Sequence, residues 1–150
     1  MKPLLLPLLL SINNIVFADL PVISELRGEN VLGPSAIAEG TSVASFFITG
    51  DGETTFRLQI IFKNCRKLKD LRSGYFLPLA SIKLKYKNAP NGSKEWDLST
   101  IPANGLNCHY IIDSFNPVQK EYDMELLVSW SGKKTTAGTF SGTASFEILP

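Results

Sequence analysis

Alternation of apolar and polar side chains is the feature that most constrains this chain. In the run 136–149, Phe140 and Phe146 fall on one side of an extended chain and hydroxyl-bearing or acidic side chains fall on the other. A period of two predicts a half-buried strand. Gly142 and Ala144 leave a shallow dip between the two rings, which a partner strand or sheet must fill.

The same period recurs along the chain, and no window of a dozen residues holds a helical repeat. Four further runs alternate: Thr54–Phe62, Ser81–Lys87, Leu106–Asp113 and Tyr122–Trp130. Thr41–Thr49 is apolar on both faces and ends in the turn Gly50–Glu53, which predicts a hairpin with Thr54–Phe62. A second turn at Pro90-Asn91-Gly92 leads into a short strand around Trp96.

About seven strands with a turn every 8 to 15 residues predict an all-β fold. We expect an immunoglobulin-like antiparallel β-sandwich in a single domain. A closed barrel is the alternative architecture.

The first residues predict export. Lys2 precedes the apolar run Leu4–Leu10, and Val16 and Ala18 occupy the −3 and −1 positions of a cleavage site. We interpret residues 1–18 as a secretory signal peptide, residues 19–40 as an extended arm and residues 41–150 as the sandwich domain. A membrane anchor is the alternative, but the run is much shorter than the roughly 20 apolar residues that span a bilayer.

Charge and cysteine content narrow the function classes. The chain has 15 Lys and Arg residues, and Lys2 is the only one within residues 1–18. The other 14 balance the 14 Asp and Glu residues, so the net charge beyond residue 18 is close to zero. This argues against a nucleic-acid binder, which needs a basic surface. In an exported chain the two cysteines, Cys65 and Cys108, are expected to form a disulfide. Closing a loop of about 44 residues stabilises by about 3–4 kcal/mol. Unpaired or intermolecular thiols are the alternative.

No catalytic constellation is apparent, and we predict neither an enzyme nor a cofactor. His109, the one histidine, falls on the outward face of its strand and has no serine or cysteine to activate. Two cysteines and one histidine are too few for a structural zinc site, so no metal is predicted. Asp51 and Glu53 share a turn and read as solvated acids rather than calcium ligands.

Basic residues gather at two places. One strand face carries Lys83, Lys85 and Lys87, and one loop carries the larger group. This loop offers a surface for anionic ligands, with solvated surface and edge protection as the alternative; it contains Lys63, Arg66, Lys67, Lys69 and Arg72. Asn91-Gly92-Ser93 also fits the glycosylation sequon, although a plain turn explains it equally.

The segment AGTFSGTASFEIL, residues 137–149, resembles the C-terminal strand of fimbrial subunits of the chaperone-usher class. Alternative and alpha-type fimbriae and spore-coat-U-like pilins end in a similar pattern of Ala-Gly-x-Tyr-Ser-Gly-x-x-Ser followed by alternating apolar residues. The matching positions here are Ala137, Gly138, Phe140, Ser141, Gly142 and Ser145, with Phe140 in place of the tyrosine.

This resemblance implies an immunoglobulin-like fold that is completed by the N-terminal arm of a neighbouring subunit, through β-augmentation. Its implied donor residues are Leu20, Val22, Ile23 and Leu26. Its implied acceptor groove contains Phe140, Phe146 and Ile148. A periplasmic chaperone would cover that groove before assembly.

The sequence therefore predicts a secreted bacterial pilin-like structural or adhesive subunit, found in the periplasm, fimbrium or cell surface. Other subunits, a chaperone and a host glycan or protein are the expected partners, and the membrane is crossed only during export. The alternative is a self-complete secreted β-sandwich that binds a glycan or protein ligand through its loops.

Overall fold

A computed structural model describes residues 20–29, 31–32, 38–65, 67–98, 103–104, 107–115, 119–130 and 138–150. In that part of the chain all regular secondary structure is β-strand. Seven strands have six or more residues: β1 (Val22–Gly28), β3 (Ala38–Thr49), β4 (Phe56–Lys63), β7 (Ser81–Tyr86), β10 (Asn107–Phe115), β11 (Glu121–Trp130) and β13 (Ala144–Leu149). The shorter strands are β2 (Val31–Leu32), β5 (Lys67–Asp70), β6 (Phe76–Pro78), β8 (Lys94–Asp97), β9 (Ala103–Asn104) and β12 (Thr139–Ser141).

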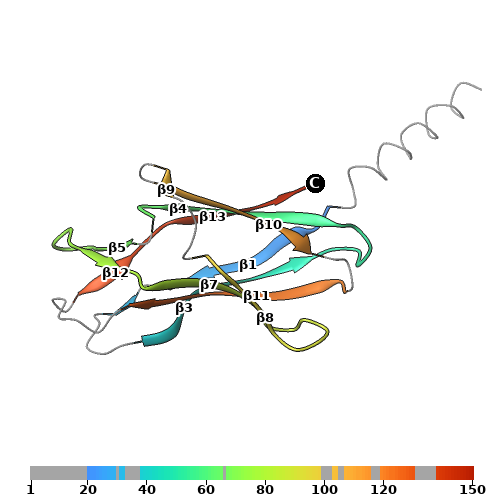
Figure 1. Ribbon diagram of the computed structural model, residues 1–150, viewed down its shortest axis with the longest axis horizontal. Coiled ribbons are helices and arrows are strands. Elements are labelled where there is room, and N and C mark those ends of the chain that lie inside the picture. The colour runs from blue at the N-terminus through green and yellow to red at the C-terminus, as the bar shows by residue number, and fades with distance from the viewer. Residues whose placement is uncertain are drawn as a thin grey trace, which may run out of the picture.

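Two antiparallel sheets form the body of the molecule (Figure 1). One has the order β1-β3-β11-β7-β8, and the other has the order β13-β4-β10-β9. A third, smaller sheet, β2-β12-β5-β6, lies at one end of the two layers (Figure 1). The predicted all-β sandwich is confirmed.

The core lies between the two larger sheets, and the period of two explains which side chains fill it. Every second residue of β11, from Tyr122 to Trp130, is buried, as is every second residue of β4, from Phe56 to Phe62. Rings join the layers, with the Phe56 and Tyr122 centroids 5.3 Å apart. Each large apolar side chain buried in this way stabilises the fold by about 1.5–3 kcal/mol.

The expected hairpin between Thr41–Thr49 and Thr54–Phe62 is wrong. These residues lie in β3 and β4, which belong to different sheets, so the connection crosses from one layer to the other. The Asp51 carboxylate holds this crossing by accepting hydrogen bonds from the backbone N–H groups of Glu53 (2.8 Å) and Thr54 (2.9 Å). The second expected hairpin, β7 to β8, is confirmed, with Leu84 opposite Trp96.

The final strand is divided, which corrects the expectation of one continuous strand over residues 136–149. β12 pairs with β5 in the small sheet, and β13 pairs with β4 in a larger one. The break falls at Gly142 and Thr143, both exposed. Phe140 and Phe146 thus contribute to different sheets.

The predicted disulfide joins Cys65 and Cys108, whose Cα atoms are 4.9 Å apart. Cys65 follows β4 and Cys108 lies in β10, so the bond links neighbouring strands of one sheet. Both residues are buried. The signal-peptide prediction for residues 1–18 and the prediction for Arg66 fall outside the described residues.

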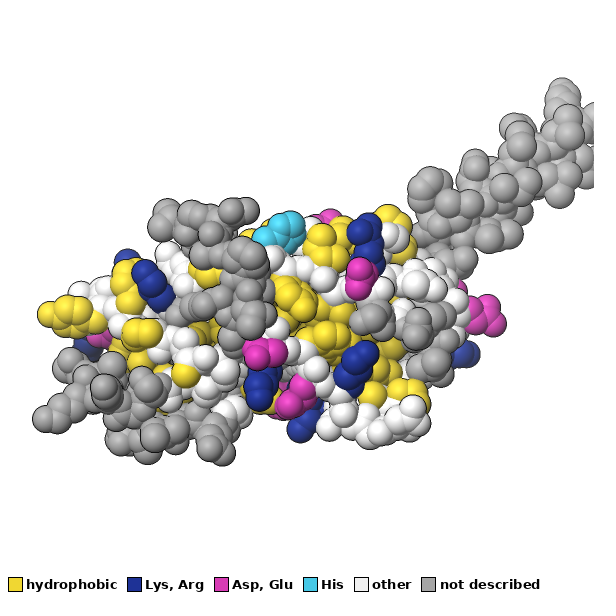
Figure 2. Space-filling view, in the orientation of Figure 1, with side chains coloured by type: hydrophobic (Ala, Val, Ile, Leu, Met, Phe, Trp, Pro, Cys, Tyr) yellow, Lys and Arg dark blue, Asp and Glu magenta, His cyan; other side chains and the backbone are white. Residues whose placement is uncertain are grey.

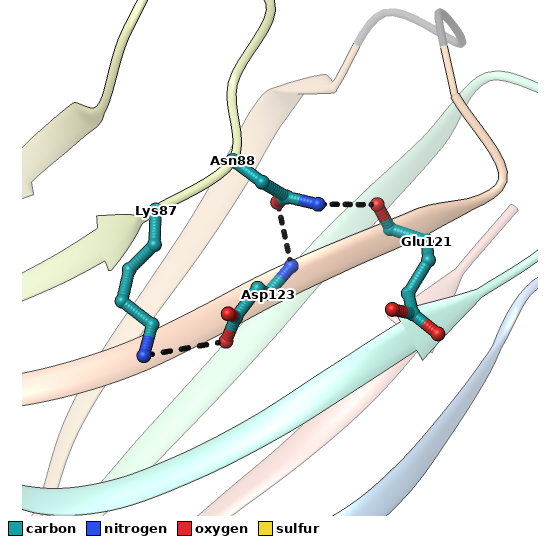
Figure 3. Close-up of polar contacts among 4 residues, drawn as sticks. All are labelled: Lys87, Asn88, Glu121 and Asp123. Atoms are coloured by element: carbon teal, nitrogen blue, oxygen red, sulfur yellow. Dashed lines mark hydrogen bonds and ion pairs between the residues drawn. The ribbon is translucent and has the colours of Figure 1, made fainter.

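The turn after β7 is fastened to β11 by Asn88 (Figure 3). Its side-chain amide donates to the Glu121 carbonyl (3.0 Å), and its side-chain oxygen accepts from the Asp123 N–H (2.8 Å). Lys87 Nζ lies 3.5 Å from Asp123 Oδ1 (Figure 3). The β7–β8 hairpin is therefore held on the central strand of its sheet.

The strand order resembles the immunoglobulin arrangement, in which strands A, B, E and D form one sheet and C, F and G the other, except that β10, beside β4, is inserted between the strands that correspond to D and E. β1, β3, β11 and β7 take the roles A, B, E and D, while β4 and β13 take C and F. No described strand takes the role of G, which would lie beside β13.

Candidate functional site: a cleft between two sheet edges

A cleft of about 320 Å³ opens between β1, the first residues of β13 and the β5 and β12 strands of the small sheet. A strand G would lie beside it, along β13. The floor of the cleft comes from the five-stranded sheet, with Ala44 of β3 and Leu126 and Val128 of β11 beneath it. The rings of Phe62, Phe140 and Phe146 and the side chains of Leu68, Leu79 and Ile82 contribute further apolar surface to the lining. The volume is at the lower end of the range for ligand pockets in proteins.

The β13 side of the cleft is a regular strand edge. Ala144–Leu149 pairs residue by residue with Arg57–Phe62 of β4, without a register shift. The Arg57 guanidinium donates to the Pro150 carbonyl at 3.1 and 3.2 Å, which holds the end of β13 in place. β13 pairs with no described strand on its other side. Its free backbone groups therefore form a template for strand pairing.

The β1 side of the cleft is irregular. The pairing of β1 with β3 shifts register between Ser24 and Arg27, and Glu25 has a positive φ of 52°. Leu26, in this bulge, is 54% exposed and lines the cleft. Bulged edges resist the addition of a further strand.

The implied donor residues lie in or beside β1. Ile23 packs against the core, and Leu20 is half-buried. Val22 is 62% exposed, like Leu26. In this chain, then, the segment forms an edge strand of its own sheet through pairing with β3. Its role as a donor stays a prediction.

The implied acceptor residues are partly brought together. Phe140 and Phe146 both line the cleft. Phe146 also contacts Phe46 across the layers, with ring centroids 4.6 Å apart. Ile148 packs against the core but is not part of the cleft lining.

Sequence reasoning identified the inward residues of β7 and β11 as core and missed that several of them form the cleft floor. Ile82, Leu126 and Val128 alternate like their neighbours, so no local signal distinguishes them.

The basic loop is divided between two places. Lys63, at the end of β4, lies at the cleft with Arg27 and Lys67. Lys69 and Arg72 belong to the β5–β6 hairpin and its turn, and both are exposed. Three cations and Glu29 are thus the charged residues that line the cleft.

The lysines of β7 have acidic neighbours instead. Lys85 lies opposite Glu125 on one side and Glu95 on the other, and Lys83 lies opposite Asp97. Opposite charges in cross-strand positions attract one another. This strand face is therefore close to electrically balanced.

The Asp70 carboxylate organises the turn between β5 and β6. Its Oδ2 accepts hydrogen bonds from the hydroxyl of Ser73 and from the Ser73 N–H (3.1 Å). These two bonds, the hydroxyl first, lower the pKa of Asp70 below its ordinary value of 3.8. The carboxylate is therefore charged at neutral pH while it is turned inward and only 8% exposed.

His109 is exposed on the outer face of β10, away from the cleft. Among the described residues, no group of three His, Cys, Asp or Glu side chains is placed to hold a metal ion.

No helix in the same part of the chain has the length and apolar character needed to cross a bilayer. No family model, curated protein or solved structure matches the chain.

Proposed function

We propose that this chain is a secreted structural subunit that assembles by strand exchange, with the cleft between β1 and β13 accepting an extended segment of another subunit. The observation that carries the proposal is the coincidence of an apolar cleft with an unpaired, regular strand edge. Strand addition uses both features, because backbone pairing gives affinity and alternate side chains fill the pockets.

The geometry favours pairing of the incoming segment with β13 rather than β1. β13 runs without a register shift beside the cleft, whereas β1 is bulged at Glu25 and Leu26. Alternate residues of the incoming strand would lie about 7 Å apart and point toward the cleft floor. This strand would occupy the empty role G of the immunoglobulin arrangement.

The N-terminal segment is the proposed donor, with Leu20, Val22, Ile23 and Leu26 as its apolar residues. As an edge strand with several exposed side chains, β1 detaches at lower cost than a central strand. Glu25 and Glu29 on the same segment complement Lys63 of β4 and Lys67 of β5, the cations at the cleft that lie outside the donor segment.

Export and a non-catalytic role belong to the same proposal. The disulfide supports an oxidising compartment such as the periplasm or cell surface. An open apolar cleft invites aggregation, so a chaperone in that compartment would cover it until assembly.

The experiment compares two neighbouring substitutions on β13 in the exported, disulfide-bonded chain. Ala144 lines the cleft, whereas Ser145 is exposed on the other side of the same strand. Ala144→Leu fills the cleft and is expected to abolish assembly, measured by light scattering and electron microscopy, while the melting temperature stays equal or rises. Ser145→Leu is expected to assemble like the parent chain.

Equal assembly of the two variants would contradict the proposal, as would a parent chain that stays monomeric and does not bind a peptide of residues 19–29. Deletion of residues 19–28 is a poorer test, because Ile23 packs against the core and its loss destabilises the fold directly.

A further inference from the structure

The small sheet has an outward face on which cations and an aromatic ring alternate. On β5, Lys67 and Lys69 are exposed while Leu68 and Asp70 point inward. Lys69 lies opposite Phe76, and Lys67 lies opposite Pro78. Phe76 is 44% exposed, and Lys67 Nζ is 5.2 Å from its ring centroid.

The turn between β5 and β6 extends this surface. Leu71 is 63% and Tyr75 is 68% exposed, and Arg72 lies between them. In Figure 2, hydrophobic and basic side chains are visible together at the end of the molecule that carries β5 and β12. Half of the large apolar side chains exposed in the described residues fall within residues 71–76, so they form a patch rather than scattered positions.

We define the hairpin face as Lys67, Lys69, Leu71, Arg72, Tyr75, Phe76 and Pro78. It is held in a fixed shape from within. Besides its bonds to Ser73, Asp70 accepts from the Gly74 N–H through its carbonyl (3.1 Å) and donates its own N–H to the Tyr75 carbonyl (2.7 Å). Because the turn is already ordered, binding of a ligand to this face costs little conformational entropy.

The hairpin face also carries uncompensated positive charge. Within the described residues, Lys67, Lys69 and Arg72 have no carboxylate within ion-pair distance. The nearby Asp70 is turned inward and hydrogen-bonded to Ser73. This differs from β7, where acidic residues lie opposite the lysines. The excess charge attracts an anionic partner.

We propose that the hairpin face binds an acidic polysaccharide. The carboxylate or sulfate groups of such a polymer meet Lys69 and Arg72 in charge-assisted hydrogen bonds. The apolar C–H faces of its sugar rings pack on Tyr75 and Phe76, whose exposed rings offer rigid, flat apolar surfaces. Lys67 above the Phe76 ring places a cation and an aromatic surface within reach of a single sugar unit.

A lipid bilayer fits this face less well. Membrane-inserting surfaces separate an apolar face from a polar one. Here Lys69 lies directly opposite Phe76 and Lys67 covers its ring, so insertion of the ring would carry ammonium groups into the bilayer. The hairpin face instead alternates cationic side chains with aromatic rings. This alternation matches a hydrated polysaccharide that carries both acidic groups and apolar sugar-ring faces.

This inference does not depend on strand exchange. Leu68 and Phe140 line the cleft from the inward side of the small sheet, whereas Lys69 and Phe76 point to its other side. Lys67 is the one residue of the hairpin face that also lines the cleft. Substitutions at Lys69, Arg72, Tyr75 and Phe76 therefore leave the cleft lining intact.

The test measures binding of the exported, disulfide-bonded protein to polygalacturonate by calorimetry, with neutral dextran and polyaspartate as comparison polymers. Lys69→Gln with Arg72→Gln is expected to weaken binding to polygalacturonate by about tenfold or more. Lys83→Gln with Lys85→Gln removes the same charge from β7 and is expected to change binding by less than about twofold. Dextran is expected not to bind.

The rings are tested separately. Tyr75→Ser with Phe76→Thr is expected to weaken binding to polygalacturonate by about fivefold and to leave the weaker binding to polyaspartate unchanged. Equal losses in the β7 control, or equal effects of the ring substitutions on both polymers, would overturn the proposal. Tighter binding to phosphatidylglycerol vesicles than to polygalacturonate, lost in the same variants, would assign the face to a membrane and overturn it as well.

Discussion

Leu68 of β5 lies so close to Gly142 that a β-carbon at position 142 would come within 2.9 Å of Leu68 Cδ2. On the same face, a β-carbon at Gly138 would come within 2.7 Å of Asp70 Oδ1. Phe140 lies between the two glycines and is buried. The glycine-aromatic-glycine spacing of this segment thus has a local cause, because inward side chains of β5 occupy the space beside it.

The two glycines are expected to differ in their tolerance of alanine. Asp70 is fixed by Ser73, so Gly138→Ala displaces a buried carboxylate and is expected to lower the free energy of unfolding by about 1–3 kcal/mol. Leu68 is able to rotate into the neighbouring cleft, so Gly142→Ala should cost less than about 1 kcal/mol. Denaturant titration measures both.

Gly28→Ala is the matched control. A β-carbon at Gly28 lies 3.8 Å from the Val43 carbonyl, an ordinary contact, and this variant is expected to match or slightly exceed the parent in stability. A larger loss from Gly142→Ala than from Gly138→Ala would show that Asp70 does not restrict the site.

The disulfide is expected to contribute strongly to stability. Cys65 and Cys108 are separated by 43 residues, and closing a loop of that length stabilises by about 4 kcal/mol on the chain-entropy account. The double variant Cys65→Ala with Cys108→Ala should lose about this much in denaturant titration. Reduction of the parent chain should give a similar loss. A change below about 1 kcal/mol in both would contradict the expectation.

Alkaline pH is expected to destabilise the core through Tyr86. Burial, together with the nearby phenol of Tyr122, raises the pKa of Tyr86 to about 12 from an ordinary 10.0. Because the folded-state pKa is the higher one, the stabilisation is complete below pH 10 and is lost as pH rises from about 10 to about 12. Tyr86→Phe should melt at a nearly constant temperature over this window, while the parent declines. Parallel curves would exclude Tyr86 as the cause.

Acidic pH is expected to loosen the turn at Asp70. Its pKa is lowered, so its contribution is complete above about pH 3.8 and is lost as pH falls through the folded-state pKa. Ser73→Ala removes the leading cause of this shift. The parent should therefore melt a few degrees above Ser73→Ala at pH 7, and the difference should shrink below pH 3.8. The pKa of Asp51 is also lowered, but Asp51 is present in both proteins. Its contribution therefore cancels when the melting temperatures of the parent and Ser73→Ala are subtracted.

Much of the fold follows from local alternation, but strand pairing does not. The buried side chains of β4, β7 and β11 are those that a period of two predicts. The same pattern gave the wrong partner for β3. Phe46 of β3 and Phe56 of β4 are both buried in one core, but they belong to opposite sheets. A local pattern of buried residues does not indicate which of the two sheets a strand belongs to. Gly142, where the last strand divides, lies against Leu68, which is more than 70 residues earlier in the sequence, so local sequence does not reveal the crowding at this position.

The candidate site was less predictable than the fold. Phe140 and Phe146 were expected at a groove through the family resemblance, and both line the cleft. Its floor residues, such as Leu126, look like any other core position in the sequence. For the hairpin face, the sequence indicated only the basic residues. It did not predict that Tyr75 and Phe76 are exposed, because their exposure depends on which side of β6 faces outward.

Amide hydrogen exchange on the assembled and monomeric protein tests strand exchange most directly. Two sheet edges are compared: β13, residues 144–149, beside the cleft, and β8, residues 94–97, at the opposite edge of the other sheet. The account predicts that the amides of residues 144–149 that point away from β4 become protected on assembly, while those of 94–97 exchange as in the monomer. Protection of 94–97 with no change at 144–149 would contradict it.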